Sequence, residues 1–139
     1  MKIVLDTNCL LQIIPRSAKH RWLFDLIKRG DIHLAVTTEI LFEYEEQMTD
    51  FYAPTVADGV LQILDTLENV HPIRIFFKWN LITADPDDNK LSDCSVAAGA
   101  DYLVTYDRHF RVLSDIEFPK IACVTLEELK TILESQEGS

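Results

Sequence analysis

Acidic residues that follow two β-rich runs are the residues of this sequence best suited to chemistry. Asp6 follows the run Lys2–Leu5, and Asp107 follows the apolar run at residues 102–104. The carboxyl ends of parallel strands meet at one edge of a sheet, where ligands bind in open α/β folds. Two carboxylates at that edge repel each other unless a cation lies between them, and hard divalent cations prefer carboxylate oxygens. The pattern therefore predicts a Mg²⁺ or Mn²⁺ site at this edge.

A short acidic segment before a predicted helix adds a further candidate. Asp88 falls in the first turn of that helix, on the face that packs against the sheet, so we expect its carboxylate beside the strand ends. Asp93 lies about 140° around the helix from Asp88, so we expect it to be solvated or to support the site from behind. Asp85 and Asp87 suit turn and capping positions.

Glu43 lies on a predicted helix that begins at Thr37 or Thr38 and ends near residue 51. It borders the apolar stripe that contains Ile40 and Tyr44. One interpretation is a solvated, acid-rich helix face, which the spacing alone favours. The other is a third metal carboxylate that reaches over the sheet edge.

The elements that must position these acids alternate between strands and helices. We expect strands at residues 2–5, 32–36, 73–77, 102–104 and 121–124, and helices at 16–29, 37–51, 54–69, 88–99 and 125–133, with a helical turn at 108–113. Such alternation predicts a three-layer α/β/α sandwich with a central, mostly parallel sheet of four or five strands. We expect one domain over residues 1–133 and a polar tail over residues 134–139.

The composition limits the classes of function. A formal net charge of −10 over 139 residues argues against a broad basic face for nucleic acid, but it allows phosphate binding through metals or binding of a basic partner. No apolar run approaches the ~20 residues of a membrane span, and the opening residues lack a signal peptide's cleavage region, so we expect a cytoplasmic protein without membrane association. The three cysteines lack metal or redox spacing, which predicts reduced, apolar residues.

Three motifs in this order resemble the PIN-domain family, specifically the VapC-like toxins of bacterial toxin–antitoxin pairs. They are Ile3-Val4-Leu5-Asp6-Thr7-Asn8, the segment Glu39–Glu46, and residues 85–90 running into 97–107. Each motif alone is weakly specific for the family, but all three in this order on an α/β plan are fairly specific. The resemblance covers residues 3 to about 130 and implies a PIN-like version of the predicted sandwich.

The resemblance implies a metal-dependent endoribonuclease. Matched by motif, the acidic residues of the family fall on Asp6, Glu43, Asp88 and Asp107, so the resemblance favours the metal-ligand interpretation of Glu43. These residues would hold one or two Mg²⁺ or Mn²⁺ ions, which activate water and neutralise the phosphate during hydrolysis of RNA. The supporting positions beside the acids are Asn8, Thr105 and Asp93.

The expected partners are an RNA substrate, a small antitoxin protein and a second copy of the chain in a homodimer. The basic residues that we expect on the RNA backbone are Arg16, Lys19, Arg21, Arg108 and Arg111. Tyr106 departs from the family pattern, because relatives often have glycine or another small residue there. It either narrows access to the site or stacks on a base.

Two alternatives compete with this interpretation. A haloacid-dehalogenase-like phosphatase requires Asp-x-Asp after the first strand, whereas this chain has Asp6-Thr7-Asn8. A non-catalytic acidic α/β module that binds a basic protein partner stays open, and binding of Mn²⁺ that depends on Asp6 or Asp107 would separate it from the nuclease.

Overall fold

A parallel five-stranded sheet forms the centre of the computed structural model, which describes residues 1–79, 89–117 and 119–137. The strand order is β3-β2-β1-β4-β5, and every neighbouring pair is parallel. The strands are β1 (Lys2–Leu5), β2 (His33–Val36), β3 (Val70–Pro72), β4 (Tyr102–Val104) and β5 (Cys123–Val124). The helices are α1 (Thr7–Leu11), α2 (Arg21–Arg29), α3 (Thr38–Phe51), α4 (Pro54–Thr66), α5 (Asn89–Ala98), the 3₁₀ helix η2 (Arg108–Asp115) and α6 (Leu126–Glu137).

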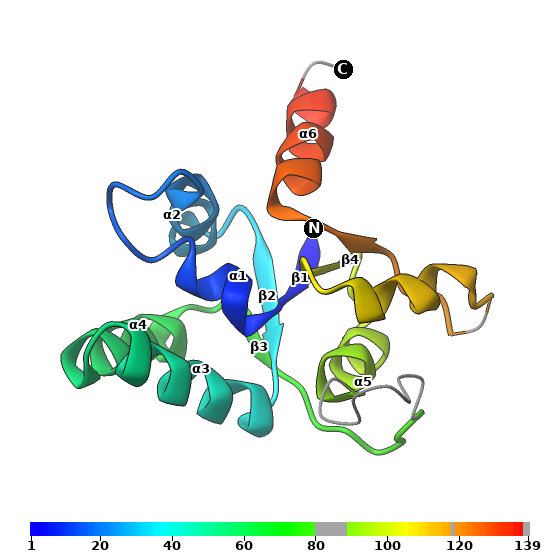
Figure 1. Ribbon diagram of the computed structural model, residues 1–139, viewed down its shortest axis with the longest axis horizontal. Coiled ribbons are helices and arrows are strands. Elements are labelled where there is room, and N and C mark those ends of the chain that lie inside the picture. The colour runs from blue at the N-terminus through cyan, green and yellow to red at the C-terminus, as the bar shows by residue number, and fades with distance from the viewer. Residues whose placement is uncertain (80–88, 118, 138–139) are drawn as a thin grey trace.

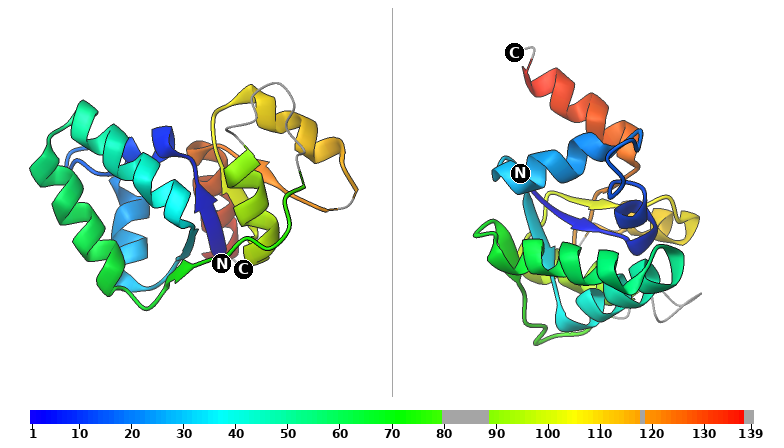
Figure 2. Two further views of the ribbon diagram at one scale, coloured as in Figure 1. Left: turned by 90° about the horizontal axis from the view of Figure 1, so that it is seen from below. Right: turned by 90° about the vertical axis from the view of Figure 1, so that its left-hand side faces the viewer.

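Helices flank the sheet on both sides (Figures 1 and 2). α3 and α4 pack side by side, while α5 lies against β1, β2 and β4. This arrangement confirms the predicted three-layer sandwich with a central parallel sheet.

The central strands are apolar because both of their faces are covered by helices. Ile3, Val4 and Leu5 of β1 are completely buried, as are Leu34 of β2 and Leu103 of β4. Burial of this continuous core holds the strand ends in register, so the residues that follow β1 and β4 emerge at one edge.

Local signals in the sequence account for several element ends. The Thr37 side chain accepts a hydrogen bond of 3.2 Å from the Ile40 N–H and so caps α3. Gly30 ends α2 with φ +85°, a left-handed conformation that favours glycine. The side chains of Thr125 and Glu128 each accept a hydrogen bond of 3.1 Å from the other's N–H, which forms a capping box at the start of α6.

The third strand lies earlier than predicted. Residues 73–77 were expected to form it because they are apolar, but β3 is Val70–Pro72. The structural reason is that β2 ends at Val36, which pairs with Pro72. The last bond between the two strands runs from the Ile73 N–H to the Val36 carbonyl, so residues 74–77 have no strand of β2 beside them. Pro72 lacks an N–H and is tolerated because β3 is an edge strand.

Several helix boundaries also differ from the prediction, and α4 ends at Thr66 instead of residue 69. α2 begins at Arg21 instead of Arg16, because successive turns bond the Ala18 N–H to the Pro15 carbonyl and the Arg21 N–H to the Ala18 carbonyl. α6 continues to Glu137, so residues 134–137 of the predicted tail are helical. The domain limit at residue 133 stays a prediction.

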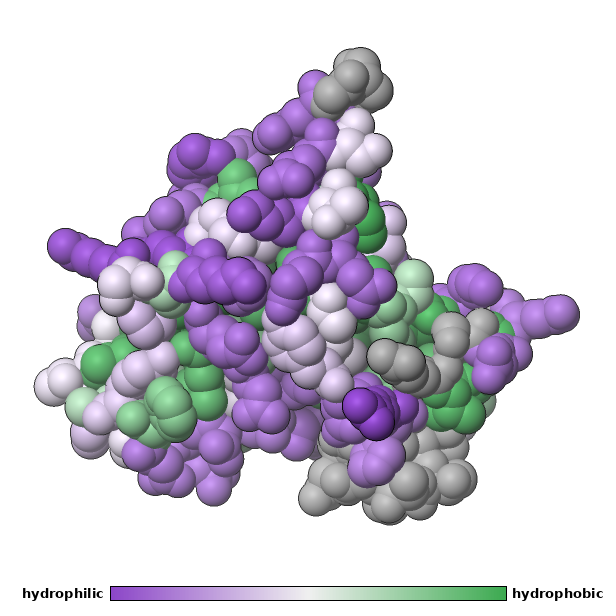
Figure 3. Space-filling view, turned by 45° about the horizontal axis from the view of Figure 1, so that its top comes forward, coloured by the Kyte–Doolittle hydropathy of each residue, from purple (hydrophilic) through white to green (hydrophobic). Residues whose placement is uncertain are grey.

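The face of the molecule in Figure 3 is mostly hydrophilic, and hydrophobic side chains gather at the lower left. Phe42 and Phe51 of α3 are exposed to solvent. In the part of the chain that the structure describes, every helix is too short or too polar to cross a membrane.

Candidate active site

Asp6 stands where β1 ends and α1 begins. Its N–H donates to the Val104 carbonyl at 3.0 Å, which ties the end of β1 to β4. Its own carbonyl accepts hydrogen bonds from the N–H groups of Cys9 and Leu10, each 3.0 Å long, and so starts α1. Backbone contacts on both sides therefore fix the point from which the Asp6 carboxylate projects.

The Thr105 hydroxyl joins Asp6 to the segment that carries Asp107. Thr105 Oγ1 donates to Asp6 Oδ2 at 2.7 Å and accepts from the Asp107 N–H at 3.0 Å. Thr105 is buried, so these bonds are shielded from water. The structure thus brings Asp6, Thr105 and Asp107 together at the carboxyl edge of the sheet, where the sequence placed them.

Asp107 starts η2. Its Oδ1 accepts a hydrogen bond of 2.9 Å from the His109 N–H, and the His109 ring Nδ1 lies 3.4 Å from the same oxygen. The capping bond fixes the carboxylate at the mouth of the site, where it is about one-third exposed.

Electrostatics at this edge disfavour the charged form of Asp6. Burial raises the pKa of the Asp6 carboxyl above its usual value, while hydrogen bonds from Thr105 and from the Thr7 backbone lower it. The negative charges of Glu43 and Asp107 raise that pKa further. Carboxylates from α3 and from the segment after β4 therefore disfavour the charged form of Asp6, which follows β1.

Glu43 has a partner that the sequence did not indicate. Its Oε2 lies 3.0 Å from the Lys90 Nζ, so the ion pair connects α3 with α5. In the sequence, the only hint of this pairing is that Lys90 lies two residues after the acidic segment that ends at Asp88. Glu43 lies near enough to affect Asp6, yet its charge is shared with a lysine.

The side chains present fit a hard divalent cation by their chemistry. Asp6, Asp107 and Glu43 offer carboxylate oxygens, which Mg²⁺ and Mn²⁺ prefer. Within the described residues, no three His, Cys, Asp or Glu side chains already stand at metal-binding distances, and Asp88 lies outside those residues. Thr7 follows Asp6 directly, and its buried hydroxyl has no hydrogen-bond partner among the residues described.

Asp93 is buried, which corrects the expectation that it could be solvated. Its Oδ1 accepts a hydrogen bond of 3.0 Å from the Trp79 N–H. This side of α5 lies against the chain at Trp79, so a backbone N–H takes the place of water as the hydrogen-bond donor to the Asp93 carboxylate. A role of Asp93 in supporting the metal site stays a prediction.

The basic residues predicted to contact RNA differ in their surroundings. Arg16, Lys19 and Arg108 are exposed, as is Asn8 on α1. Arg21 donates to the Ile14 carbonyl, pairs with Asp25 at 3.1 Å, and stacks over the Phe24 ring at 4.7 Å. Those contacts hold Arg21 within the molecule, while the side chain of Arg111 lies outside the described residues.

The three cysteines are free, as predicted. Burial raises the pKa of the Cys94 thiol to about 12 and that of Cys123 to about 11. Their thiols are therefore protonated at neutral pH and are poor nucleophiles.

Solved structures share this fold at low sequence identity. A chain of VapBC2 from Rickettsia felis, crystallised with a DNA fragment from their promoter, aligns with a TM-score of 0.61 and 17% identity, over 90% of this chain and 98% of that one. DNA-bound VapBC from Salmonella typhimurium aligns with a TM-score of 0.54 and 17% identity, over 91% of this chain and 98% of that one. FitAcB from Neisseria gonorrhoeae aligns with a TM-score of 0.54 and 16% identity, over 90% of this chain and 98% of that one.

Sequence comparison places the chain in a family. No curated protein matches it in sequence. The family described as PIN domain matches residues 2–109, a span from β1 into η2 that contains Asp6, Glu43, Thr105 and Asp107. With most of its length matched and its acids gathered at the carboxyl edge of a parallel sheet, this chain belongs to the PIN domain family, a family of nucleases.

Proposed function

We propose that the protein is a Mg²⁺- or Mn²⁺-dependent endoribonuclease that acts as the toxin of a toxin–antitoxin pair. The observation that carries this proposal is the Thr105 hydroxyl, which bridges Asp6 and the Asp107 backbone where two adjacent parallel strands end. A half-buried aspartate beside other carboxylates is unfavourable in the folded protein unless it has a task such as binding a cation.

Each residue has a role in the proposed reaction. Asp6 and Asp107 would hold the metal, with Glu43 and Asp88 as further ligands and Asn8 and Asp93 in support. When bound, such an ion supplies Lewis-acid activation of water and neutralises charge on the phosphate. Thr105 orients the Asp6 carboxylate by donating to Oδ2, and it holds the start of η2 by accepting from the Asp107 N–H. The exposed residues Arg16, Lys19 and Arg108 would meet the RNA backbone, together with Arg111 and, if its internal contacts open, Arg21.

The test is cleavage of a mixed pool of structured RNA in Mg²⁺, in Mn²⁺ and in EDTA. Wild type should cut in the presence of metal only, and Asp6→Asn should lose at least 100-fold, the scale of loss seen when one charge-stabilising group is removed from an active site. Asp65→Asn is the matched control, because Asp65 is an exposed aspartate on α4, a helix that carries none of the candidate metal ligands.

The outcomes separate the proposal from its rival. Cutting lost in Asp6→Asn and kept in Asp65→Asn supports the nuclease. Metal binding without any cutting contradicts general cleavage of structured RNA and limits the activity to particular sequences. Neither cutting nor binding of Mn²⁺ would reject the enzyme and favour the acidic module that binds a basic protein.

The proposed partner is a small antitoxin protein, and we also propose a homodimer. Support for the antitoxin comes from the solved structures of similar fold, which are of VapBC and FitAcB. Co-expression with a small candidate antitoxin should give a complex that does not cut RNA, and sedimentation of the isolated chain should give twice its 16.0 kDa mass. The candidate is a protein that co-purifies with this chain. A monomer that stays active with that protein present would contradict both parts.

A further inference from the structure

A groove of about 800 Å³ borders the acidic edge. It lies between α1, the loop before α2 and the end of α3, and Asn8, Gln12, Lys19, Tyr106 and Glu127 are among its lining residues. Pockets of roughly 300–1,000 Å³ hold small ligands, so this groove can accept a nucleobase with its ribose. The metal-ligand candidates have neighbours in its wall: Asn8 follows Asp6 by two residues, and Tyr106 precedes Asp107 directly.

Tyr106 presents an aromatic ring in this groove, and a hydrogen bond from its hydroxyl orients the ring. Its hydroxyl donates to the Glu127 carboxylate, with oxygens at 2.5 and 2.6 Å, while 39% of the residue's surface stays exposed. The same bond is the main cause that lowers the pKa of Glu127.

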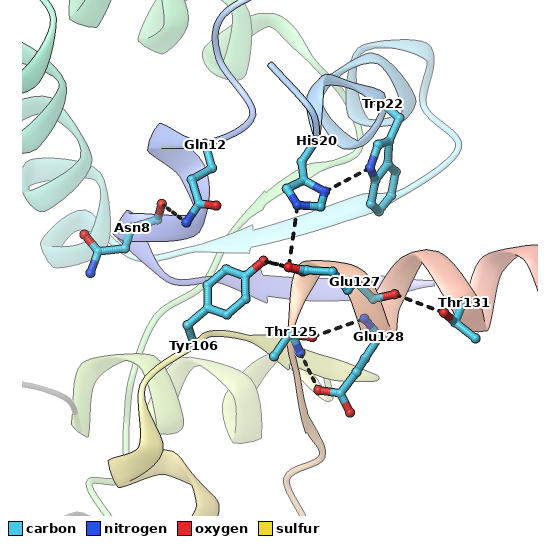
Figure 4. A network of polar contacts seen from close by, with 9 residues as sticks. All are labelled: Asn8, Gln12, His20, Trp22, Tyr106, Thr125, Glu127, Glu128 and Thr131. Carbon is cyan, nitrogen blue, oxygen red and sulfur yellow. Dashed lines mark hydrogen bonds and ion pairs between the residues drawn. The ribbon is translucent and has the colours of Figure 1, made fainter.

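His20 lies near Glu127 and faces its carboxylate. Figure 4 shows Tyr106 and His20 directed at Glu127, with Asn8 and Gln12 of α1 on the other side of the tyrosine. His20 is buried, and its Nδ1 accepts from the Trp22 indole N–H at 3.3 Å. The indole nitrogen can only donate, so the ring proton of His20 sits on Nε2, which faces Glu127 Oε1 at 3.7 Å.

We propose that this groove binds a nucleobase of the RNA substrate next to the scissile phosphate, with the Tyr106 ring as the stacking surface. The inference rests on the ribonuclease function proposed above. Tyr106 and Asp107 are consecutive residues, with Cα atoms about 3.8 Å apart, so a nucleotide with its phosphate at Asp107 would have its flanking base near the ring. A ring that is fixed before binding loses little conformational entropy when a base stacks on it.

The groove also offers the other contacts that a nucleotide needs. Lys19 is exposed at the groove and carries a positive charge suited to a neighbouring phosphate. Gln12 Nε2 donates to the Asn8 carbonyl at 3.3 Å, which leaves the Gln12 amide oxygen and the Asn8 amide to meet a base edge. An aromatic ring flanked by amides and one cation suits a single-stranded base.

The test measures base stacking separately from cleavage. Fluorescent hexaribonucleotides, each with one abasic position moved along the strand, are titrated by anisotropy in EDTA, so that metal-dependent cutting cannot occur. Removing the base at one position should weaken binding to wild type by about 5- to 150-fold, the range measured for one stacked base. Tyr106→Ala should bind the intact and abasic oligonucleotides equally, and Tyr106→Trp should restore the difference.

Controls distinguish stacking from a loss of structure. Phe42→Ala removes an exposed aromatic ring on α3 that does not line this groove, so it should keep the difference between intact and abasic strands. A 2-aminopurine at the sensitive position should be quenched by wild type and by Tyr106→Trp, but not by Tyr106→Ala. Equal thermal stability of the variants makes these comparisons valid.

Each result decides between the inference and its alternatives. Wild type that cuts RNA but shows no base-dependent difference overturns the inference and leaves the nuclease intact. A base-dependent difference that needs Tyr106, without any cutting, retains the groove and rejects the nuclease. Binding of an arginine-rich peptide in place of the oligonucleotide, lost in Tyr106→Ala, overturns the inference and assigns the groove to a protein partner.

Discussion

At the scale of single residues, one hydroxyl organises the acidic edge. Thr105 Oγ1 contacts both Asp6 and the Asp107 N–H, and it is buried where water cannot replace it. A hydroxyl can donate to one group while accepting from another, which neither a carboxylate nor an amide hydrogen can do. Threonine at this position therefore holds the Asp6 carboxylate beside the backbone of Asp107.

Thr105→Val should destabilise the protein by roughly 1–3 kcal/mol, because the Asp107 N–H loses its acceptor at the buried Thr105 and Asp6 loses a donor. The pKa of Asp6 should rise further, since the Thr105 hydrogen bond is the largest cause that lowers it. Urea unfolding measures the first effect, and Mn²⁺ titration should show weaker binding. Thr105→Ser keeps the hydroxyl and should stay near wild type; equal losses in both variants would contradict a role for this hydroxyl.

Asp6→Asn should stabilise the metal-free protein at neutral pH. The pKa of Asp6 is raised on folding, so between the ordinary and the raised value the folded state holds more protons than the unfolded state. Stability of wild type therefore falls as pH rises through that interval, and the penalty is complete above it. Asparagine carries no charge, and its amide oxygen can still accept from Thr105.

Thermal unfolding in EDTA from pH 3 to pH 8 measures this effect. The difference between Asp6→Asn and wild type should be small at the acidic end and grow as Asp6 ionises. A difference that stays flat with pH, or a mutant less stable than wild type at neutral pH, would argue against the electrostatic strain at Asp6.

At the scale of elements, the ion pair between α3 and α5 controls the third carboxylate. Lys90 Nζ lies 3.0 Å from Glu43 Oε2, with side chains 23% and 32% exposed, so the pair is partly screened by water. Its contribution to stability is therefore small, about 1 kcal/mol or less. Its effect on the site is larger, because the lysine offsets one of the negative charges that would attract a cation.

Lys90→Gln should tighten Mn²⁺ binding several-fold and change the free energy of unfolding by less than ~1 kcal/mol. Isothermal titration measures the affinity, and urea unfolding measures the stability. Lys28→Gln is the matched control, because Lys28 pairs with Asp25 on α2 at 3.8 Å and does not pair with a candidate metal ligand. Weaker Mn²⁺ binding in Lys90→Gln would instead make Lys90 a support of the bound state.

At the scale of the whole molecule, an excess of negative charge weakens the folded state. The net charge of −10 produces self-repulsion that compaction increases. Part of this repulsion is spread over the surface, where monovalent salt screens it. The remainder is concentrated at the acidic edge, where a bound divalent ion removes it more effectively.

Raising NaCl from about 0.05 to 0.5 M should raise the melting temperature of metal-free wild type through screening. Millimolar Mg²⁺ or Mn²⁺ at constant ionic strength should raise it further, because a ligand that binds only the folded state stabilises it. Differential scanning calorimetry separates the two increments. The double variant Asp6→Asn, Asp107→Asn should keep the NaCl increment and lose the divalent one; an unchanged divalent increment would place metal binding elsewhere.

Much of the fold could be predicted from short stretches of sequence. The strand at residues 2–5, the Thr37 cap, the stop at Gly30 and the capping box at Thr125 all act over a few residues, so they are visible without the fold. The resemblance to the PIN family was confirmed. The third strand was misplaced because its limits depend on where β2 ends, which the residues at 73–77 do not encode.

The sequence by itself determined the strand–helix alternation and the two aspartates that follow β1 and β4, because strand propensity and chain order bring those ends to one edge. Only the tertiary structure decided the bridge from Thr105 to Asp6, which spans 99 positions, and the pairing of Glu43 with Lys90. It also placed Tyr106 against Glu127 beside the acids. Such contacts depend on how whole helices pack against the sheet, and no local pattern of residues carries that information.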